Sequence, residues 1–94
     1  MAIRSFKDRR SAILFDGQRP KGFPPDLVRI ARRKLRAIDA AVAVRDLVEP
    51  PGNRLEKLKG GRAGQWSIRI NDQWRVCFVW MDDGAHDVEV VDYH

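Results

Sequence analysis

Residues 92–94 of the sequence are an acid, a tyrosine and a histidine, and six basic residues precede them within residues 54–75. Tyr93 and His94 can each move a proton, and lysine or arginine can neutralise the charge that develops on a phosphorus atom. RNA carries its own nucleophile, the 2′-OH, so a protein that cuts it needs only positioning, charge stabilisation and proton transfer. These residue types therefore indicate chemistry on a phosphodiester, with no metal and no cofactor.

A strand expected at residues 88–91 should hold this end of the chain in place. If the strand continues, alternation puts Tyr93 on one face of the sheet and Asp92 with His94 on the other. Without that support, a terminal histidine is more often a frayed end than a catalyst. In that structural interpretation Tyr93 caps the core and Asp92 is an ordinary strand-end acid.

Other kinds of active site fit the sequence poorly. The single cysteine, Cys77, excludes a disulfide framework, and its place within an apolar strand favours a buried, inert thiol. No CxxC motif or closely spaced histidine pair is present to bind a metal ion. The glycines of residues 59–64 precede no helix, so they do not form a phosphate-binding loop. None of the serines follows the pattern of a nucleophile elbow.

The net charge of +5 is unevenly distributed. Residues 1–48 hold 12 basic and 5 acidic residues, and residues 54–75 hold six basic and two acidic ones. Residues 76–94 hold five acids and no lysine or arginine. We interpret the first group mainly as solvated helix faces, which could contact a polyanion or an acidic partner, and the second as a polyanion site. The sequence contains no membrane-spanning run and no signal peptide, which predicts a cytosolic protein with no membrane partner.

The first half of the sequence has the apolar spacing of helices. We expect a short helix over residues 7–16 and a longer one that begins at Pro24-Pro25-Asp26. Residues 40–47 indicate a further helical turn or two, ended by the prolines at 50 and 51. The apolar stripe of the longer helix consists of Leu27, Ile30, Ala31, Leu35 and Ile38.

The second half of the sequence alternates as strands do. Residues 66–70 alternate apolar and polar side chains, and residues 74–81 are apolar on both faces after the first arginine, which is typical of a central strand. Tight turns follow each run, a last strand is expected at residues 88–91, and residues 2–6 give a weak strand signal. The chain is therefore expected to form one α+β domain, residues 1–94. Two to three N-terminal helices would pack on a small antiparallel meander with a short N-terminal strand.

The three tryptophans raise the question of base stacking, because aromatic side chains can bind single-stranded RNA. Trp66 and Trp80 alternate with polar residues, which favours packing inside the protein. Trp74, next to a turn, is more open and remains a candidate for RNA contact.

Several short motifs occur together in this chain. They are Ile3-Arg4-Ser5-Phe6, Leu55-Glu56-Lys57-Leu58-Lys59-Gly60, Arg62, Gly64, Trp66-Ser67-Ile68-Arg69, Trp74-Arg75 and Asp92-Tyr93-His94. In combination they resemble HigB-type toxins of the RelE/ParE superfamily of bacterial type II toxin–antitoxin systems. The resemblance covers essentially the whole chain.

The resemblance implies a function and a set of partners. Toxins of this kind enter the ribosomal A site and cut mRNA there, with the 2′-OH as nucleophile and no metal. The resemblance also implies inhibition by a HigA-type helix-turn-helix antitoxin, usually encoded downstream. Operator DNA would be contacted only through that antitoxin.

The same resemblance assigns roles to individual residues. Asp92, Tyr93 and His94 match the family's C-terminal catalytic motif, Lys59 matches the basic residue of its LKG segment, and Arg75 matches the arginine after the hairpin tryptophan. We expect Lys59 and Arg75 to contact the scissile phosphate, and Tyr93 or His94 to move protons. The expected RNA-binding residues are Lys57, Arg62, Arg69 and Trp74.

Two departures from the family pattern keep other functions open. Some HigB members carry a histidine just before the LKG segment, where this chain has Glu56-Lys57, and a basic residue near the hairpin turn, where this chain has Asn71. If that histidine is the general base in those members, His94, Glu56 or Tyr93 must take its role here, or the reaction is slower. A ParE-like inhibitor of DNA gyrase would share the fold without needing Tyr93, His94 or Lys59. A catalytically weak co-repressor that only binds the antitoxin is a further alternative.

Overall fold

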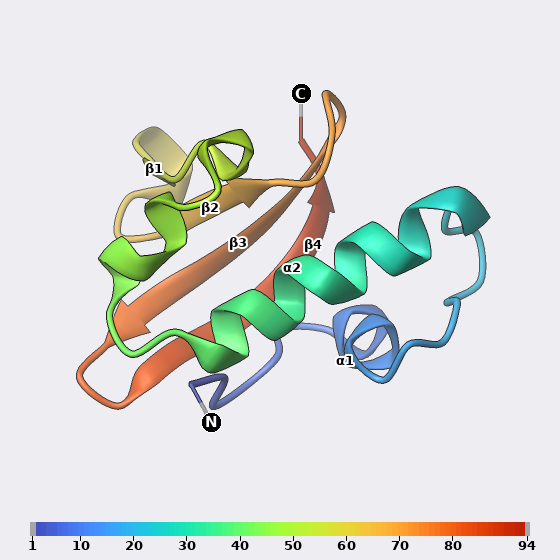
Figure 1. Cartoon of the computed structure of the whole chain (residues 1–94), viewed down its shortest axis with the longest axis horizontal. Helices are drawn as coiled ribbons and strands as arrows, with labels where there is room; N and C mark the ends of the chain where they lie inside the picture. Colours follow the sequence, from blue (N-terminus) through green and yellow to red (C-terminus); the bar gives the residue numbers. More distant parts are fainter. Residues whose placement is uncertain (1, 94) are drawn as a thin grey trace.

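The computed structural model describes residues 2–93 as two α-helices packed on one antiparallel sheet, and Met1 and His94 lie outside this description (Figure 1). The strands have the order β1-β2-β3-β4, so each pairs with its neighbour in the sequence. The predicted α+β meander is thus confirmed. The elements are α1 (Arg9–Phe15), η1 (Pro25–Leu27), α2 (Val28–Ala40), η2 (Val44–Val48), η3 (Pro51–Asn53), β1 (Glu56–Lys57), η4 (Gly60–Arg62), β2 (Trp66–Arg69), β3 (Trp74–Met81) and β4 (Gly84–Asp92), where η marks a 3₁₀ helix.

Helix α2 supplies the helical half of the core. The apolar stripe that the sequence predicts is buried: Ala31, Leu35 and Ile38 are fully covered against the sheet. Burial of a leucine or isoleucine side chain contributes about 1.5–3 kcal/mol, so this stripe fixes how α2 lies on the strands. The arginines between these positions stay exposed.

The further helical turn that the sequence predicts at residues 40–47 is present, but as the 3₁₀ helix η2 and not as an α-helix. Helix α2 ends at Ala40, and Ala41 already has extended backbone angles. The Asp46 carboxylate then accepts hydrogen bonds from the backbone N–H groups of Ala43 (3.0 Å) and Val42 (2.9 Å), which lower the pKa of Asp46. Because a side-chain cap of this kind competes with helix propagation, only the short 3₁₀ helix η2 follows.

Residues 2–6 also differ from the expected strand, because they form only two isolated parallel bridges to β4. Their backbone approaches β4 so closely that a Cβ atom at Gly84 would lie 2.1 Å from the carbonyl oxygen of Ala2. Gly84 has a φ of +126°, so conformation and space both require glycine at this position. The close approach anchors the N-terminal segment at the outer edge of the sheet.

Candidate functional site

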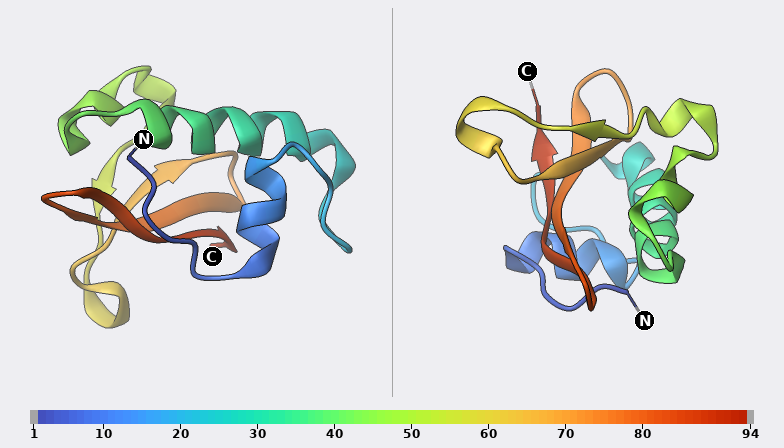
Figure 2. Two further views of the ribbon diagram at one scale, coloured as in Figure 1. Left: turned by 90° about the horizontal axis from the view of Figure 1, so that it is seen from below. Right: turned by 90° about the vertical axis from the view of Figure 1, so that its left-hand side faces the viewer.

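The sheet separates two sets of side chains. Helices α1 and α2 lie on one side of it, and the loop that carries η4 projects on the other (Figure 2). Val76 and Phe78 join the main core on the helix side. Strand β3 is buried on both faces, as the sequence predicts for a central strand. A second, small cluster on the opposite face, called the open face below, consists of Leu58, Cys77 and Val91 with Tyr93 packed against them.

Arg75 is held on the open face by two contacts. Its Nη1 donates a hydrogen bond of 2.8 Å to the hydroxyl oxygen of Ser67, across the paired strands β2 and β3. Its guanidinium carbon lies 5.7 Å from the ring centroid of Tyr93, within the range of a cation–π interaction. Two of the residues predicted to act in catalysis are therefore brought together.

A hollow of about 460 Å³ adjoins Tyr93 on this face. Strand β1, which the sequence analysis missed, pairs with β2 and places Glu56 opposite Ser67 and Lys57 opposite Trp66. This pairing carries the exposed Lys59, which directly precedes η4, to the same edge of the sheet. Two residues are too few for alternation to reveal a strand. The hollow is lined by Glu56, Lys57, Leu58, Lys59 and Tyr93.

Asp92 and Tyr93 lie on opposite faces of the sheet, as the alternation of side chains along a strand predicts. Asp92 pairs with Trp74 across the β3–β4 ladder, and its Oδ2 accepts a hydrogen bond of 3.0 Å from the Gln73 side chain. The Tyr93 backbone N–H donates to the Gln73 carbonyl oxygen at 2.7 Å. Gln73 thus holds the end of β4, a role that the sequence analysis missed. The expected pairing of Asp92 with His94 lies outside the described residues.

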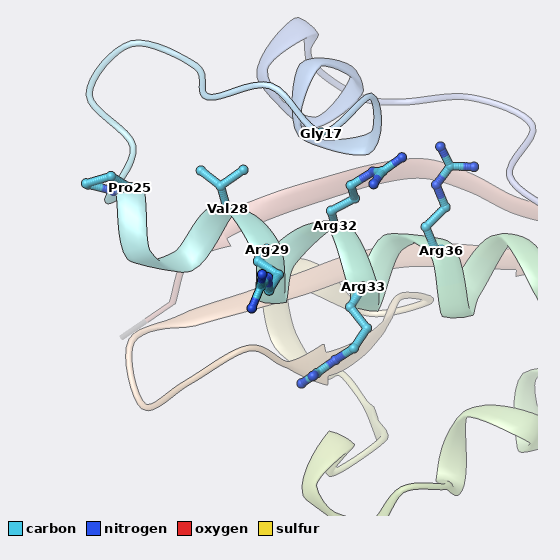
Figure 3. A pocket seen from close by; sticks show the side chains of 7 residues that line it. All are labelled: Gly17, Pro25, Val28, Arg29, Arg32, Arg33 and Arg36. Carbon is cyan, nitrogen blue, oxygen red and sulfur yellow. The ribbon is translucent and has the colours of Figure 1, made fainter.

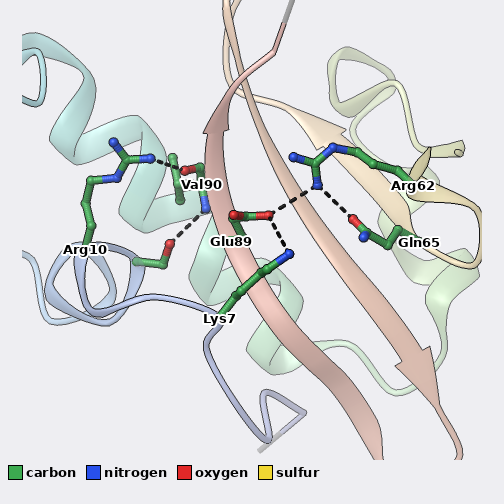
Figure 4. A network of polar contacts seen from close by, with 7 residues as sticks. Lys7, Arg10, Arg62, Gln65, Glu89 and Val90 are labelled. Atoms are coloured by element: carbon green, nitrogen blue, oxygen red, sulfur yellow. Dashed lines mark hydrogen bonds and ion pairs between the residues drawn. The ribbon is translucent and has the colours of Figure 1, made fainter. Parts of the chain in front are cut away.

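Arg62 belongs to a polar network that spans the open face (Figure 4). Its Nη1 lies 3.2 Å from Glu89 Oε1 and 3.1 Å from Gln65 Oε1, and Lys7 Nζ lies 4.0 Å from the same Glu89 oxygen. Lys7 and Glu89 were not predicted as part of the site, because residues 82 positions apart meet only through the fold. The network adds two cations and one half-buried carboxylate to the open face.

The side chains of the other predicted RNA-binding residues differ in their exposure to solvent. Lys57 is exposed, with its Nζ 5.7 Å from the centroid of the Trp66 ring, and Arg69 pairs with the exposed Asp72. Trp74 is only 7% exposed and packs edge-on against Phe23, so its ring offers no free face to a base. The prediction that Trp74 contacts RNA is therefore corrected. It failed because Trp74 belongs to the side of β3 that the helices cover.

Cys77 is buried at the centre of the open-face cluster, and its burial raises the pKa of the thiol. The predicted burial of Cys77 is thus confirmed, and a protonated, covered thiol is a poor nucleophile. Among residues 2–93, no three histidine, cysteine or acidic side chains gather where they could hold a metal ion. In the same part of the chain, no helix is both long and apolar enough to cross a membrane.

Comparison with known proteins decides the family. A family model described as the RelE-like toxin of the type II toxin–antitoxin system HigB matches residues 4–94. The chain belongs to this HigB-like family. It is 42% identical over 81 residues to Toxin HigB-1 of Vibrio cholerae, which covers 85% of each chain. It is 34% identical over 92 residues to Endoribonuclease HigB of Proteus vulgaris, which covers 98% of this chain and 99% of the relative.

The HigB-like chain also shares its fold with more distant toxins. It aligns over its full length with a chain of the YoeB-YefM complex from Staphylococcus aureus, at a TM-score of 0.62 and 19% identity. This similarity confirms the RelE-like fold that the sequence motifs implied. Glu56 lines the hollow beside Lys59 and Tyr93. The stretch Glu56-Lys57, where the sequence analysis noted a departure from the family pattern, thus borders the candidate site.

Proposed function

We propose that this HigB-like toxin is a ribosome-dependent endoribonuclease that cuts mRNA in the ribosomal A site, in the cytoplasm. One observation carries the proposal: Arg75 lies against the Tyr93 ring, beside the hollow that Lys59 lines. A cation held by two contacts, an exposed cation and a hydroxyl that can move a proton are thereby gathered beside one hollow. The relative named as an endoribonuclease, which matches this chain from end to end, supports the same activity.

In the proposed reaction the 2′-OH oxygen of the RNA attacks the adjacent phosphorus atom. The bond from phosphorus to the 5′-oxygen of the next nucleotide breaks, which leaves a 2′,3′-cyclic phosphate and a 5′-hydroxyl. A base takes the 2′-OH proton and an acid donates one to the leaving oxygen, so the protons balance. Lys59 and Arg75 neutralise the non-bridging oxygens, where negative charge develops. The protein contributes Arg75 from β3, and Lys59 and Tyr93 from the segments that follow β1 and β4, and needs no covalent intermediate.

Proton transfer is assigned to three groups at the site. The Tyr93 hydroxyl, on the ring that lies against Arg75, is proposed to move one of these protons. Glu56 lines the same hollow and provides a carboxylate where some HigB members have a histidine. His94 directly follows Tyr93 in the sequence and completes the set, with Asp92 to orient it.

The proposed partners follow from the toxin–antitoxin family. A HigA-type helix-turn-helix antitoxin would inhibit the toxin and carry the complex to operator DNA, and ribosome-bound mRNA would be the substrate. Three cations, the exposed Lys57 and the half-buried Arg62 and Arg69, are proposed to contact the RNA backbone, because phosphate neutralisation provides affinity without base specificity.

Mapping of 5′ ends on purified ribosomes tests this proposal. Wild-type toxin should cut a defined mRNA in the A site, and Arg75→Ala should lower the cleavage rate on the order of 10²-fold or more, the loss typical for removal of one charge-stabilising group. His94→Ala should also slow cleavage. Arg45→Ala is the matched control, because it removes an exposed arginine that is distant from the site in the sequence and shares no contact with the site residues that the structure describes. Intact mRNA with wild-type toxin would overturn the proposal, and inhibition of gyrase supercoiling instead would identify a ParE-like toxin.

A further inference from the structure

A second basic site lies on the helix side of the molecule, away from the open face (Figure 3). Four arginines occupy positions 29, 32, 33 and 36 of α2. Arg29 and Arg33 are four residues apart, as are Arg32 and Arg36, so the members of each pair lie one helical turn from each other. All four are exposed. They line a groove of about 570 Å³ together with Gly17, Pro25 and Val28. We call this feature the α2 groove.

Two of the arginines are held in place by α1. Arg32 Nε donates a hydrogen bond of 3.3 Å to the Phe15 carbonyl oxygen, and the Arg36 guanidinium lies 4.3 Å from the Phe15 ring centroid. Gly17 makes room for this arrangement, because a Cβ atom there would lie 3.1 Å from Arg32 Nε. Figure 3 shows Arg32 and Arg36 turned toward α1, and Arg29 and Arg33 turned to the other side of α2.

The charge of the α2 groove has no counterpart within the described chain. None of the four arginines is ion-paired with a carboxylate of residues 2–93. Like charges four residues apart destabilise a helix by a few tenths of a kcal/mol per pair, so the arrangement costs stability in the isolated chain. A bound anionic partner would remove that cost.

The lining of the groove distinguishes between the two anionic partners that a toxin of this kind meets. An RNA backbone offers phosphates but nothing that fills an apolar surface. The α2 groove combines guanidinium groups with the exposed ring of Pro25 and the half-buried side chain of Val28. Carboxylates beside an apolar side chain match both features, since the planar guanidinium group binds a carboxylate through two hydrogen bonds.

We infer that the α2 groove binds an acidic, amphipathic segment of the antitoxin. This inference rests on the proposed antitoxin partner but not on the proposed cleavage reaction. Because the sheet lies between α2 and the open face, the segment would bind without touching Arg75 or Tyr93. The antitoxin would then hold the toxin through a surface separate from the residues that cut RNA.

The test measures binding of the co-expressed, purified antitoxin by calorimetry. The double variant Arg29→Glu/Arg33→Glu changes the two arginines that make no contact with α1. It should weaken antitoxin binding by about 30-fold or more, in the range measured when close charge pairs at interfaces are broken. Arg9→Glu/Arg45→Glu makes the same change of net charge at two exposed arginines outside the groove, and should weaken binding less than 3-fold.

A second variant tests the apolar part of the groove. Val28→Thr keeps the shape of the side chain and replaces a methyl group with a hydroxyl, so antitoxin binding should weaken about 3-fold while binding to purified ribosomes stays unchanged. Thermal unfolding of each variant checks that the fold is intact.

Three outcomes would overturn the inference. In the first, the groove variant binds the antitoxin within 3-fold of wild type. In the second, the groove variant loses only its binding to ribosomes, which would make the groove an RNA surface. In the third, the wild-type chain does not bind the antitoxin. If the groove variant loses antitoxin binding but the wild-type toxin cuts no mRNA, the inference stands and the proposed cleavage activity fails.

Discussion

At the scale of single residues, the open face depends on contacts between side chains that lie far apart in the sequence. Arg75 is fixed by Ser67 and by Tyr93, which pair with it only because β3 lies between β2 and β4. Side-chain type made Tyr93 a candidate and placed Arg75 among six basic residues, and the family resemblance then singled out Arg75. Ser67 was not a candidate, because an uncharged hydroxyl gains its role only from the strand register.

Tyr93→Phe separates proton transfer from packing. Phenylalanine keeps the ring that packs on Leu58, Cys77 and Val91 and lies against Arg75, but it lacks the hydroxyl. If that hydroxyl moves a proton, kcat for cleavage on ribosomes should fall on the order of 10²-fold while KM changes little. Thermal stability should stay within about 0.5 kcal/mol of wild type, as for other changes that leave packing intact. Unchanged kcat would assign the proton transfer to His94 or Glu56 alone.

The tryptophans show what alternation can and cannot predict at this scale. Alternation correctly grouped Trp74 with Val76 and Phe78 on one side of β3, and Trp66 and Trp80 do pack against the core. It did not indicate which side the helices would cover. The proximity of Trp74 to a turn suggested an open position, but Phe23, from the loop before α2, packs against its ring.

At the scale of elements, the segment between α2 and β1 positions the lysines of the hollow. Asn53, fully buried in η3, donates hydrogen bonds of 3.1 Å to the carbonyl oxygens of Leu47 and Glu49 and accepts one from Lys34 Nζ. Burial lowers the pKa of Lys34, and Arg33 and Arg69 act in the same direction. Asn53 thus ties η2, η3 and α2 together six residues before Lys59.

Periodicity could predict α2 and β3 but not this connection. Both elements are long enough for their spacing to appear in the sequence, whereas η3 and β1 span three and two residues. Their positions depend on hydrogen bonds from one buried asparagine, which no local pattern marks.

Asn53→Ala should therefore destabilise the protein by about 2–4 kcal/mol, because it leaves two carbonyl oxygens and the Lys34 ammonium group without their partner. Urea unfolding measures this change. Asn71→Ala is the matched control: it removes an asparagine whose Oδ1 accepts two backbone N–H bonds in the β2–β3 turn, and should cost about 1 kcal/mol. A smaller loss for Asn53→Ala than for Asn71→Ala would show that the asparagine does not anchor the segment.

At the scale of the whole molecule, the sheet divides the positive charge into two surfaces. One is the α2 groove, and the other is the open face, where Lys7, Arg62 and Arg75 surround Glu89 and Cys77. The sequence analysis separated these groups by charge counts alone, as residues 1–48 and 54–75. It could not place Lys7, which belongs to the first group in sequence and to the open face in space.

Glu89 limits the charge that the open face presents to RNA. Its carboxylate lies between Arg62 and Lys7 and is only 16% exposed, so it neutralises cations that would otherwise face a phosphate backbone. Glu89→Gln should tighten binding of a fluorescent single-stranded RNA by roughly 3-fold at 50 mM salt. Affinity should also fall more steeply with salt, because more counterions are released when more phosphates are neutralised. Glu49→Gln, an equal change of charge at an exposed glutamate outside both surfaces, should have a smaller effect on both quantities. Equal effects of the two variants would mean that net charge, and not the position of Glu89 between two cations, governs RNA binding.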